Sequence, residues 1–192
     1  MNLKIKIKLH ALNPMDETKN QDNYEAPTIL LKDSSNNELF CYLEQIVNVE
    51  NKEYALLTPV DTPVTLFKIN DKDEPELIEK IEKNEQILKN ADAVLQEHDL
   101  NLVRSAVTLT VSGELEEPVY DDLEEADIND ESETYELLVN FNVLNDEYGL
   151  YVPLDPFFIV GKIENQTAIL IEDKEFDRVQ PLIESELEKS SS

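Results

Sequence analysis

Apolar and polar residues alternate with a period of two along several short stretches of this chain, the pattern of half-buried β-strands. The longest such stretch is ELFCYLEQIVNV at residues 38–49. Turn-forming residues precede it at 33–37, and ENK at 50–52 leads into EYALLTP. We therefore predict a hairpin here, preceded by a strand at 28–32 and followed by another at 64–69.

The second half of the chain shows the same alternation. YELLVNFNVLN at residues 135–145 predicts a long strand, and shorter strands are predicted at 105–113, 157–163 and 167–173. Within each long strand the apolar residues share one parity, so we predict one buried face per strand. These residues are Leu39, Cys41, Leu43, Val47 and Val49 in the first strand, and Leu137, Val139, Phe141 and Val143 in the second.

Two stretches change to helical spacing. Residues 84–98 place Ile87, Ala91 and Leu95 on one stripe, which predicts an amphipathic helix. At the C-terminus, Phe176, Val179, Leu182, Ile183 and Leu187 recur in the same way. Proline is favoured in the first turn of a helix, so we expect Pro181 to open the final helix.

The phrase Glu-Tyr-x-Leu-x-x-Pro-x-Asp occurs twice, at residues 53–61 and 147–155, 94 residues apart. A structural interpretation is that the tyrosine lies on a strand, the proline ends its hydrogen-bond ladder, and the aspartate binds nearby backbone amides. The functional alternative is a ligand site built from the two aspartates. The residues of this motif are Tyr54, Pro59, Asp61, Tyr148, Pro153 and Asp155.

The repeated phrase, with similar elements around both copies, predicts a duplicated β-rich unit. The expected fold class is α+β and mainly β: two similar β-rich units, each closed by a short C-terminal helix. We predict an N-terminal extension at 1–25, a first repeat at 26–98 and a second at 99–192. An acidic loop at 114–133 is inserted in the second repeat.

Charge narrows the possible partners. The chain has 16 Lys and Arg against 43 Asp and Glu, a net charge of −27. Such a chain repels nucleic acids and anionic membranes, whereas it attracts basic protein surfaces and multivalent cations; solubility alone is the alternative explanation. Residues 114–133 contain 11 acids and no base, so we expect this loop to be extended. The candidate interaction residues within it are Glu116, Glu117, Asp121, Asp122, Glu124, Glu125 and Asp127.

Candidate catalytic and metal-binding residues are few. Cys41 is the only cysteine and lies on the apolar parity of its strand, so we expect a buried small side chain rather than a nucleophile. One cysteine and two distant histidines, His10 and His98, are too few for a zinc site. Carboxylates cluster at 70–76 and 127–133, but neither cluster has the spacing of a calcium loop. We therefore assign no catalytic, cofactor-binding or metal-binding residue.

The residues also carry a resemblance to a known family. The runs FCYLEQIVNV, EYALLTPVDTPV, LTVSGEL and YGLYVPLDPFF resemble an uncharacterised family, classed as a domain of unknown function, that is widespread in cyanobacteria and plastids. The resemblance covers about residues 26 to 188. The repeats are also similar to a small acidic bacterial domain that is likewise uncharacterised. The resemblance implies a photosynthetic cell, and offers no catalytic residues to carry over.

Together these observations predict a non-enzymatic protein-interaction or assembly and regulatory factor that binds a basic protein surface. The alternative is a weak divalent-cation-binding protein that uses its clustered carboxylates. Lysines interrupt the apolar residues of MNLKIKIKLHAL, so no signal-peptide core is expected, and no run is long enough to span a membrane. We expect the protein in the cyanobacterial cytoplasm or the plastid stroma.

Overall fold

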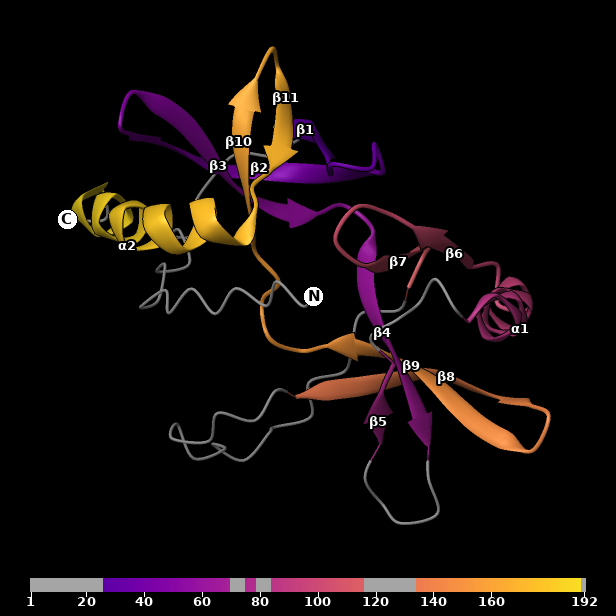
Figure 1. Cartoon of the computed structure of the whole chain (residues 1–192). Helices are drawn as coiled ribbons and strands as arrows, with labels where there is room; N and C mark the ends of the chain where they lie inside the picture. Colours follow the sequence, from indigo (N-terminus) through magenta and orange to yellow (C-terminus); the bar gives the residue numbers. More distant parts are fainter. Residues whose placement is uncertain (1–25, 70–74, 79–83, 116–133, 191–192) are drawn as a thin grey trace, which may run out of the picture. The chain divides into compact units, whose positions relative to one another are not determined.

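The computed structural model describes residues 26–69, 75–78, 84–115 and 134–190 (Figure 1). Their contacts divide the chain into two compact units. Unit 1 is the central segment Asp61–Pro156, and unit 2 joins Asn2–Val60 to Phe157–Ser192. Unit 2 is therefore assembled from both ends of the chain, with the sequence of unit 1 inserted between them.

Unit 2 contains a closed barrel of five strands in the order β1-β11-β10-β3-β2. Strand β1 closes it, because it pairs antiparallel with β2 and parallel with β11. Between β2 and β3, Glu50 and Asn51 both have positive φ, as a tight two-residue hairpin turn requires. The strands are β1 Thr28–Lys32, β2 Glu38–Val49, β3 Lys52–Pro59, β10 Ile159–Glu164 and β11 Thr167–Leu170.

The barrel is narrow and filled with side chains. Leu31, Cys41 and Leu57 are fully buried. At Gly161 a Cβ atom would lie 3.0 Å from the Cβ of Ala168 and 3.1 Å from Cδ1 of Leu31, closer than ordinary van der Waals contact. A larger residue at this position would therefore collide with the side chains of Ala168 and Leu31.

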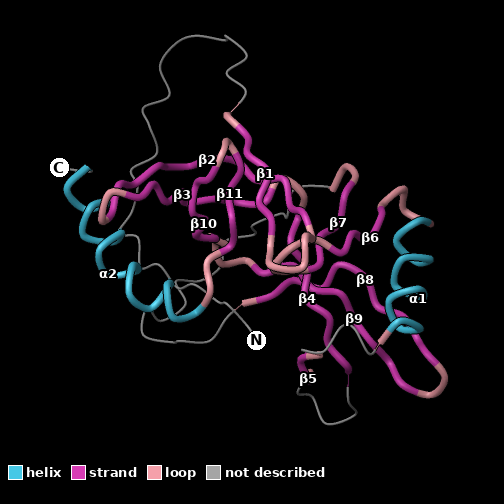
Figure 2. Tube along the Cα trace, turned by 45° about the horizontal axis from the view of Figure 1, so that its top comes forward, coloured by secondary structure: helices cyan, strands magenta, loops and turns pink. Residues whose placement is uncertain are grey.

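Helix α2 (Asp173–Ser190) covers the outside of the barrel over β2 (Figure 2). Its apolar stripe packs on Tyr54, Leu56 and Val160. The expectation that Pro181 opens the helix is wrong, because Pro181 lies inside it. The helix continues through the exposed proline because the buried stripe runs on both sides of it. The stripe consists of Phe176, Val179, Ile183 and Leu187.

Unit 1 contains an open sheet in the order β6-β7-β4-β9-β8, with the short strand β5 paired to β4. Within the described residues no strand joins β6 to β8, so this sheet does not close as the barrel does. The strands are β4 Thr62–Ile69, β5 Glu76–Leu77, β6 Asn101–Arg104, β7 Leu109–Ser112, β8 Tyr135–Val143 and β9 Asp146–Pro153.

Helix α1 (Glu85–Gln96) covers one face of this sheet and contacts both β8 and β6. Its buried side chains are Leu88, Ala91 and Leu95, whereas Ile87 of the predicted stripe is only partly buried. They pack in one cluster with residues of the strands, including Leu66 and Leu150. This cluster is the core of unit 1.

The hairpins β2–β3 and β8–β9 have the same register. Val47 pairs with Tyr54, and Phe141, 94 residues after Val47, pairs with Tyr148. Each hairpin also has one β-bulge, between Leu43 and Gln45 in β2 and at the corresponding place, 137–139, in β8. Every residue pair of one ladder thus recurs in the other at a constant shift of 94.

The predicted fold class is wrong in its central statement. The chain does not form two similar β-rich units, each closed by a C-terminal helix: one unit holds a closed barrel and the other an open sheet. Only α2 ends a unit at the C-terminus, since α1 is followed by β6 and β7. The loop at 114–133 lies outside the described residues after Leu115.

The physical reason is an exchange of elements between the two halves of the sequence. Hairpin β2–β3 is completed by β10 and α2 from the C-terminal half. Hairpin β8–β9 is completed by β4 and α1 from the N-terminal half. Neither half closes on itself. The boundary that we predict between the two sequence repeats, at residues 98 and 99, stays a prediction.

The prediction of one buried face per long strand is also wrong. In β2, Leu39 and Cys41 point into the barrel, whereas Val47 and Val49 pack under α2 on the opposite face. The bulge at Glu44 inserts one residue into the ladder, so side chains of the same parity change face there. The bulge in β8 has the same effect.

Candidate functional site

The seven acids predicted to bind a partner lie outside the described residues. Residues 116–133 are not among the described residues, and these acids span residues 116–127. Their role as an interaction site therefore stays a prediction. The carboxylate cluster at 127–133 is outside as well, and of the cluster at 70–76 only Pro75 and Glu76 are described.

The six residues of the repeated phrase occupy corresponding places in the two hairpins. Pro59 and Pro153 are the last residues of β3 and β9. The amide of the next residue still donates to the neighbouring strand in both cases, Val60 to the Phe40 carbonyl and Leu154 to the Thr134 carbonyl, so the prolines do not end the hydrogen bonding. The Thr134 amide donates a hydrogen bond to Asp155 Oδ2 over 3.3 Å. Asp155 thus accepts a bond from an amide 21 residues away, just before β8, and its predicted role in the local turn stays a prediction. Asp61 begins unit 1 directly after β3.

The two tyrosines of the phrase differ in their contacts. Tyr148 in β9 is 7% exposed and stacks on Phe141 with ring centroids 6.0 Å apart. Tyr54 in β3 is 1% exposed, and its hydroxyl donates a 2.7 Å hydrogen bond to Glu175 Oε1 on α2. Only Tyr54 therefore joins a polar network.

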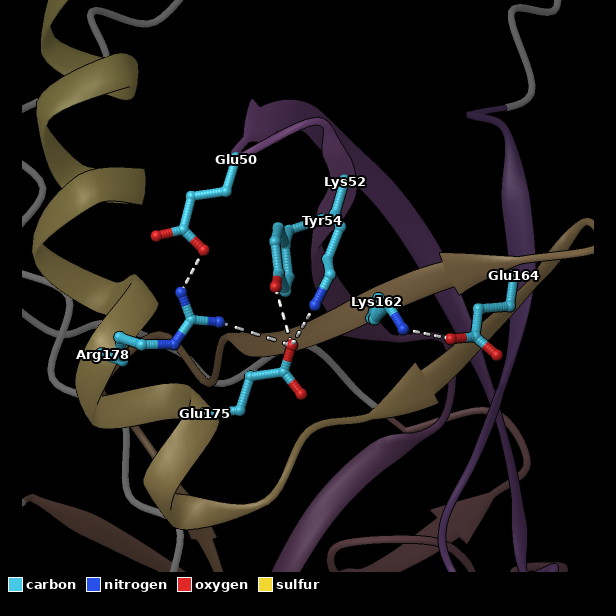
Figure 3. A network of polar contacts seen from close by, with 7 residues as sticks. All are labelled: Glu50, Lys52, Tyr54, Lys162, Glu164, Glu175 and Arg178. Carbon is cyan, nitrogen blue, oxygen red and sulfur yellow. Dashed lines mark hydrogen bonds and ion pairs between the residues drawn. The ribbon is translucent and has the colours of Figure 1, made fainter.

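That network lies between the β2–β3 hairpin and α2 (Figure 3). Besides Tyr54, Glu175 Oε1 faces Lys52 Nζ at 3.7 Å and Arg178 Nη2 at 3.9 Å. Arg178 extends the network to Glu50 in the hairpin turn. Figure 3 also shows Lys162 nearby on β10, bound to Glu164. One carboxylate thus has a phenol and two cations around it.

The network shifts the pKa values of its members in opposite directions. The hydrogen bond from Tyr54 holds the pKa of Glu175 below its ordinary value, and Lys52, Lys162 and Arg178 act in the same direction. Burial, and then the bond to Glu175, raises the pKa of Tyr54 to about 12. At neutral pH the carboxylate is therefore charged and the phenol protonated. Because both pKa values lie far from neutral pH, the arrangement is suited to holding α2 against the hairpin rather than to acid–base catalysis.

Sequence reasoning missed this network. Glu175 and Arg178 lie one turn apart on a predicted helix, which is a detectable signal for a polar face. Their partner Tyr54 is 121 residues from Glu175 in the sequence, and nothing in the local pattern connects the two.

Cys41 is buried inside the barrel, as predicted, and is not exposed. Burial raises the pKa of its thiol to about 12, so the thiolate is scarce at neutral pH. Among the described residues no group of three or more His, Cys, Asp or Glu side chains could hold a metal ion.

An aromatic cluster lies on the sheet of unit 1, on the face opposite α1. Phe67 in β4 meets Tyr135 and Tyr151 in edge-to-face contacts, each with ring centroids 5.2 Å apart. Leu137 lies beside them and is 45% exposed. Burial, and then the charge of Asp155, raises the pKa of Tyr135. We call Phe67, Tyr135, Leu137 and Tyr151 the aromatic face.

We expect Tyr54→Phe to lower the free energy of unfolding of unit 2 by about 1.5–3 kcal/mol, the usual contribution of a hydrogen bond to a charged group. The matched control is Tyr148→Phe, the counterpart position, where the described contact is ring stacking. We expect that variant to lose less than about 0.5 kcal/mol. Urea unfolding followed by NMR signals of each unit measures both values. Equal losses of stability in the two variants would contradict a specific contribution of the Tyr54 hydroxyl.

The same variant changes the pH dependence of stability. Because the pKa of Glu175 is lowered on folding, its charge stabilises the folded state above its ordinary value of 4.5, and this is lost as pH falls through the folded-state pKa. Without the Tyr54 hydroxyl, the pKa of Glu175 should rise toward that value. NMR titration of the Glu175 carboxylate measures the rise.

Comparisons with known proteins found a single family match, which covers part of the chain. No curated protein and no solved structure matches it significantly. No helix in the described part of the chain is long and apolar enough to cross a membrane. The family match covers β6 to α2 and excludes every element before β6. Of the resemblance expected over about 26–188, a similarity to an uncharacterised domain family is therefore found in the second half only. Over residues 99–190 the chain is similar to the family described as "Protein of unknown function (DUF3727)".

Proposed function

We propose that this protein is a non-enzymatic interaction or assembly and regulatory factor, which binds a basic surface of a partner protein. The observation that carries the proposal is the uneven charge of the two units. Residues 61–156 contain 26 Asp and Glu against 6 Lys and Arg, a net charge of −20. All other residues together contribute −7. The acidic character therefore belongs to unit 1.

Concentrated charge of one sign favours a partner of the opposite sign. It accelerates the encounter with a basic surface and disfavours polyanions. Residues 105–161 contain 15 acids and no Lys or Arg, so no cation within this stretch neutralises the charge. Within it, residues 116–127 contain the seven acids that we propose as contacts.

The chemistry of the described residues supports a binding role over a catalytic one. The buried Cys41 thiol, with its pKa near 12, is a poor nucleophile. Tyr54, with its pKa near 12, is a weak acid at neutral pH, and the lowered pKa of Glu175 makes its carboxylate a weak base. We propose the cyanobacterial cytoplasm or the plastid stroma as the location, on the basis of the resemblance in the sequence.

The test uses a variant in which the seven acids become Asn or Gln, so that charge changes with little change of shape. A control variant neutralises seven acids outside unit 1. Both variants have the same net charge, so they separate local from overall electrostatics. The control positions are Asp16, Glu17, Asp22, Glu25, Glu53, Glu172 and Asp177.

We expect the wild-type chain to capture a basic protein from an extract of photosynthetic cells at about 0.05 M salt and to retain much less of it at about 0.5 M. With that purified partner, the first variant should bind at least about tenfold more weakly, a loss of about 1.4 kcal/mol. The control variant should bind within about threefold of wild type, a difference below 1 kcal/mol. Equal weakening of both variants, or binding that salt does not affect, would overturn the proposal.

Calcium titration by calorimetry separates the cation-binding alternative. Binding of a basic protein predicts no saturable heat below about millimolar Ca²⁺, because scattered carboxylates do not form a cage. Saturable binding at lower concentration that disappears in the first variant would support the alternative instead.

A further inference from the structure

The two hairpins with matching registers each carry two faces, and one face of each is covered by a helix. In unit 2, Val47, Tyr54 and Leu56 pack under α2. In unit 1, Phe141, Tyr148 and Leu150, their counterparts 94 residues later, belong to the core under α1. The helix-covered faces therefore correspond.

The third strands correspond as well. Strand β10 pairs with β3 so that Lys162 lies opposite Tyr54, and β4 pairs with β9 so that Lys68 lies opposite Tyr148. Next to them, β11 pairs with β10, and β5 pairs with β4. Four strands of unit 1, in the order β8-β9-β4-β5, thus repeat the arrangement β2-β3-β10-β11 of the barrel.

The uncovered faces have different surroundings. In unit 2 this face is the interior of the barrel, and β1 seals it by joining β2 to β11. In unit 1 the described residues contain no strand that joins β8 to β5. The counterparts are Leu57 and Tyr151, Cys41 and Tyr135, Leu43 and Leu137, Ala55 and Gly149, and Gly161 and Phe67.

Burial differs accordingly at these positions. Leu57 and Cys41 are fully buried in the barrel, whereas Tyr151 and Tyr135 are only partly buried. Leu137 is the most exposed member of the aromatic face. Among the described residues, no strand of unit 1 takes the place that β1 fills in unit 2, beside these large apolar side chains.

We propose that the aromatic face of unit 1 binds an extended strand of a partner protein, which adds to the edge of β8 that faces away from β9. This is recognition by strand addition: backbone hydrogen bonds give affinity, and alternate side chains give specificity. In unit 2 the Leu43 amide donates to the carbonyl of Pro27, just before β1, over 2.8 Å. Leu137 holds the counterpart position in β8.

Strand β1 indicates the chemistry of the partner strand. Its Leu31 points into the barrel and is fully buried. Its Lys32 points outward and pairs with Glu38 of β2, Nζ to Oε1 2.8 Å. In unit 1 the strand edges carry exposed Glu136 on β8 and Glu76 on β5. The fitting partner strand alternates apolar residues, which face the aromatic side chains, with basic residues, which face outward.

This inference rests on the proposed function only for the basic character of the partner. The binding site itself is separate from the acidic residues 116–127. Apolar burial on the aromatic face and backbone pairing to β8 are largely independent of salt, whereas attraction to the acids is not. The two proposals can therefore fail separately.

The test uses the full chain and a labelled nine-residue peptide that alternates Ile and Lys. Two control peptides have the same composition in blocks, or the same sequence with N-methylated backbone amides. The variant Leu137→Ser removes apolar surface from the aromatic face. Its matched control is Leu144→Ser, because Leu144 is 96% exposed in the turn of the same hairpin.

We expect the alternating peptide to bind at about 0.5 M salt, and both control peptides to bind at least about tenfold more weakly. Leu137→Ser should weaken binding at least about tenfold, and Leu144→Ser less than about twofold. NMR shifts should change along β8 and β5. Equal binding of the alternating and block peptides, or no effect of Leu137→Ser, would overturn the inference.

Two further variants assign the cause of a failure. If neutralising the seven acids abolishes binding while Leu137→Ser does not, the proposed function holds and the strand site is wrong. If only Leu137→Ser abolishes it, the strand site holds without the acids. Deleting residues 1–12, which also alternate apolar residues and lysines, tests whether the chain's own segment is the occupant. Peptide binding that appears only after this deletion would overturn the assignment to a partner protein.

Discussion

Leu57→Ala is expected to lower the free energy of unfolding of unit 2 by about 2–5 kcal/mol, the range for truncation of a fully buried leucine. Leu57 lies at the centre of the barrel, where it pairs with Leu43 on one side and Ile159 on the other. Its side chain is not exposed at all. Closed strands surround the position, so the wall cannot collapse into the space that the smaller side chain leaves.

The matched control is Tyr151→Ala, at the counterpart position in unit 1. Tyr151 is only partly buried and makes one edge-to-face contact with Phe67. Its truncation should therefore cost less than about 2 kcal/mol. Hydrogen exchange of the backbone amides of β3 and β9, recorded at increasing urea concentration, measures the free energy of unfolding of each unit separately. A larger loss at Tyr151 than at Leu57 would contradict the assignment of a closed and an open face.

Gly161→Phe should prevent the barrel from closing. It introduces the residue that unit 1 has at the counterpart position, Phe67. Added methylenes in a packed core cost about 1–3 kcal/mol, and a phenyl ring exceeds that because Leu57 Cδ1 would lie only 3.3 Å from the new Cβ atom. We expect unit 2 to lose its cooperative unfolding transition while unit 1 keeps its core.

The readout is amide exchange in β10 and β11, with α1 as the internal reference. The control Gly161→Ala adds a single methyl group and should keep the barrel folded with a measurable loss of stability. Protected β10 amides in Gly161→Phe would show that the barrel accommodates the ring, contrary to the packing described above.

Part of the candidate site could be predicted from the sequence. Pro59 and Pro153 are the last residues of their strands, the place that the sequence predicts for them. Burial of Cys41 followed from its neighbours Leu39 and Leu43. The network around Glu175 could not be predicted, because a hydrogen bond between residues 121 apart depends on how the helix docks.

Hydrophobic periodicity by itself determined that 38–49 and 135–143 form long strands and that 85–96 forms a helix, since alternation and helical spacing are local properties of the chain. Only the tertiary structure decided which elements complete each hairpin. The third strand and the helix that complete a hairpin have similar apolar faces in both halves of the sequence. Local patterns therefore do not show whether a hairpin is completed by elements of its own half or of the other half.

The positions of the two β-bulges were also decided by the tertiary structure. An inserted residue does not interrupt the alternation of apolar and polar residues in the sequence, but it turns every later side chain to the other face of the sheet. Leu39 therefore lies inside a barrel and Val47 under a helix, although both have the same parity. Strand pairing, a contact between distant segments, places the bulge and so determines which residues form the core.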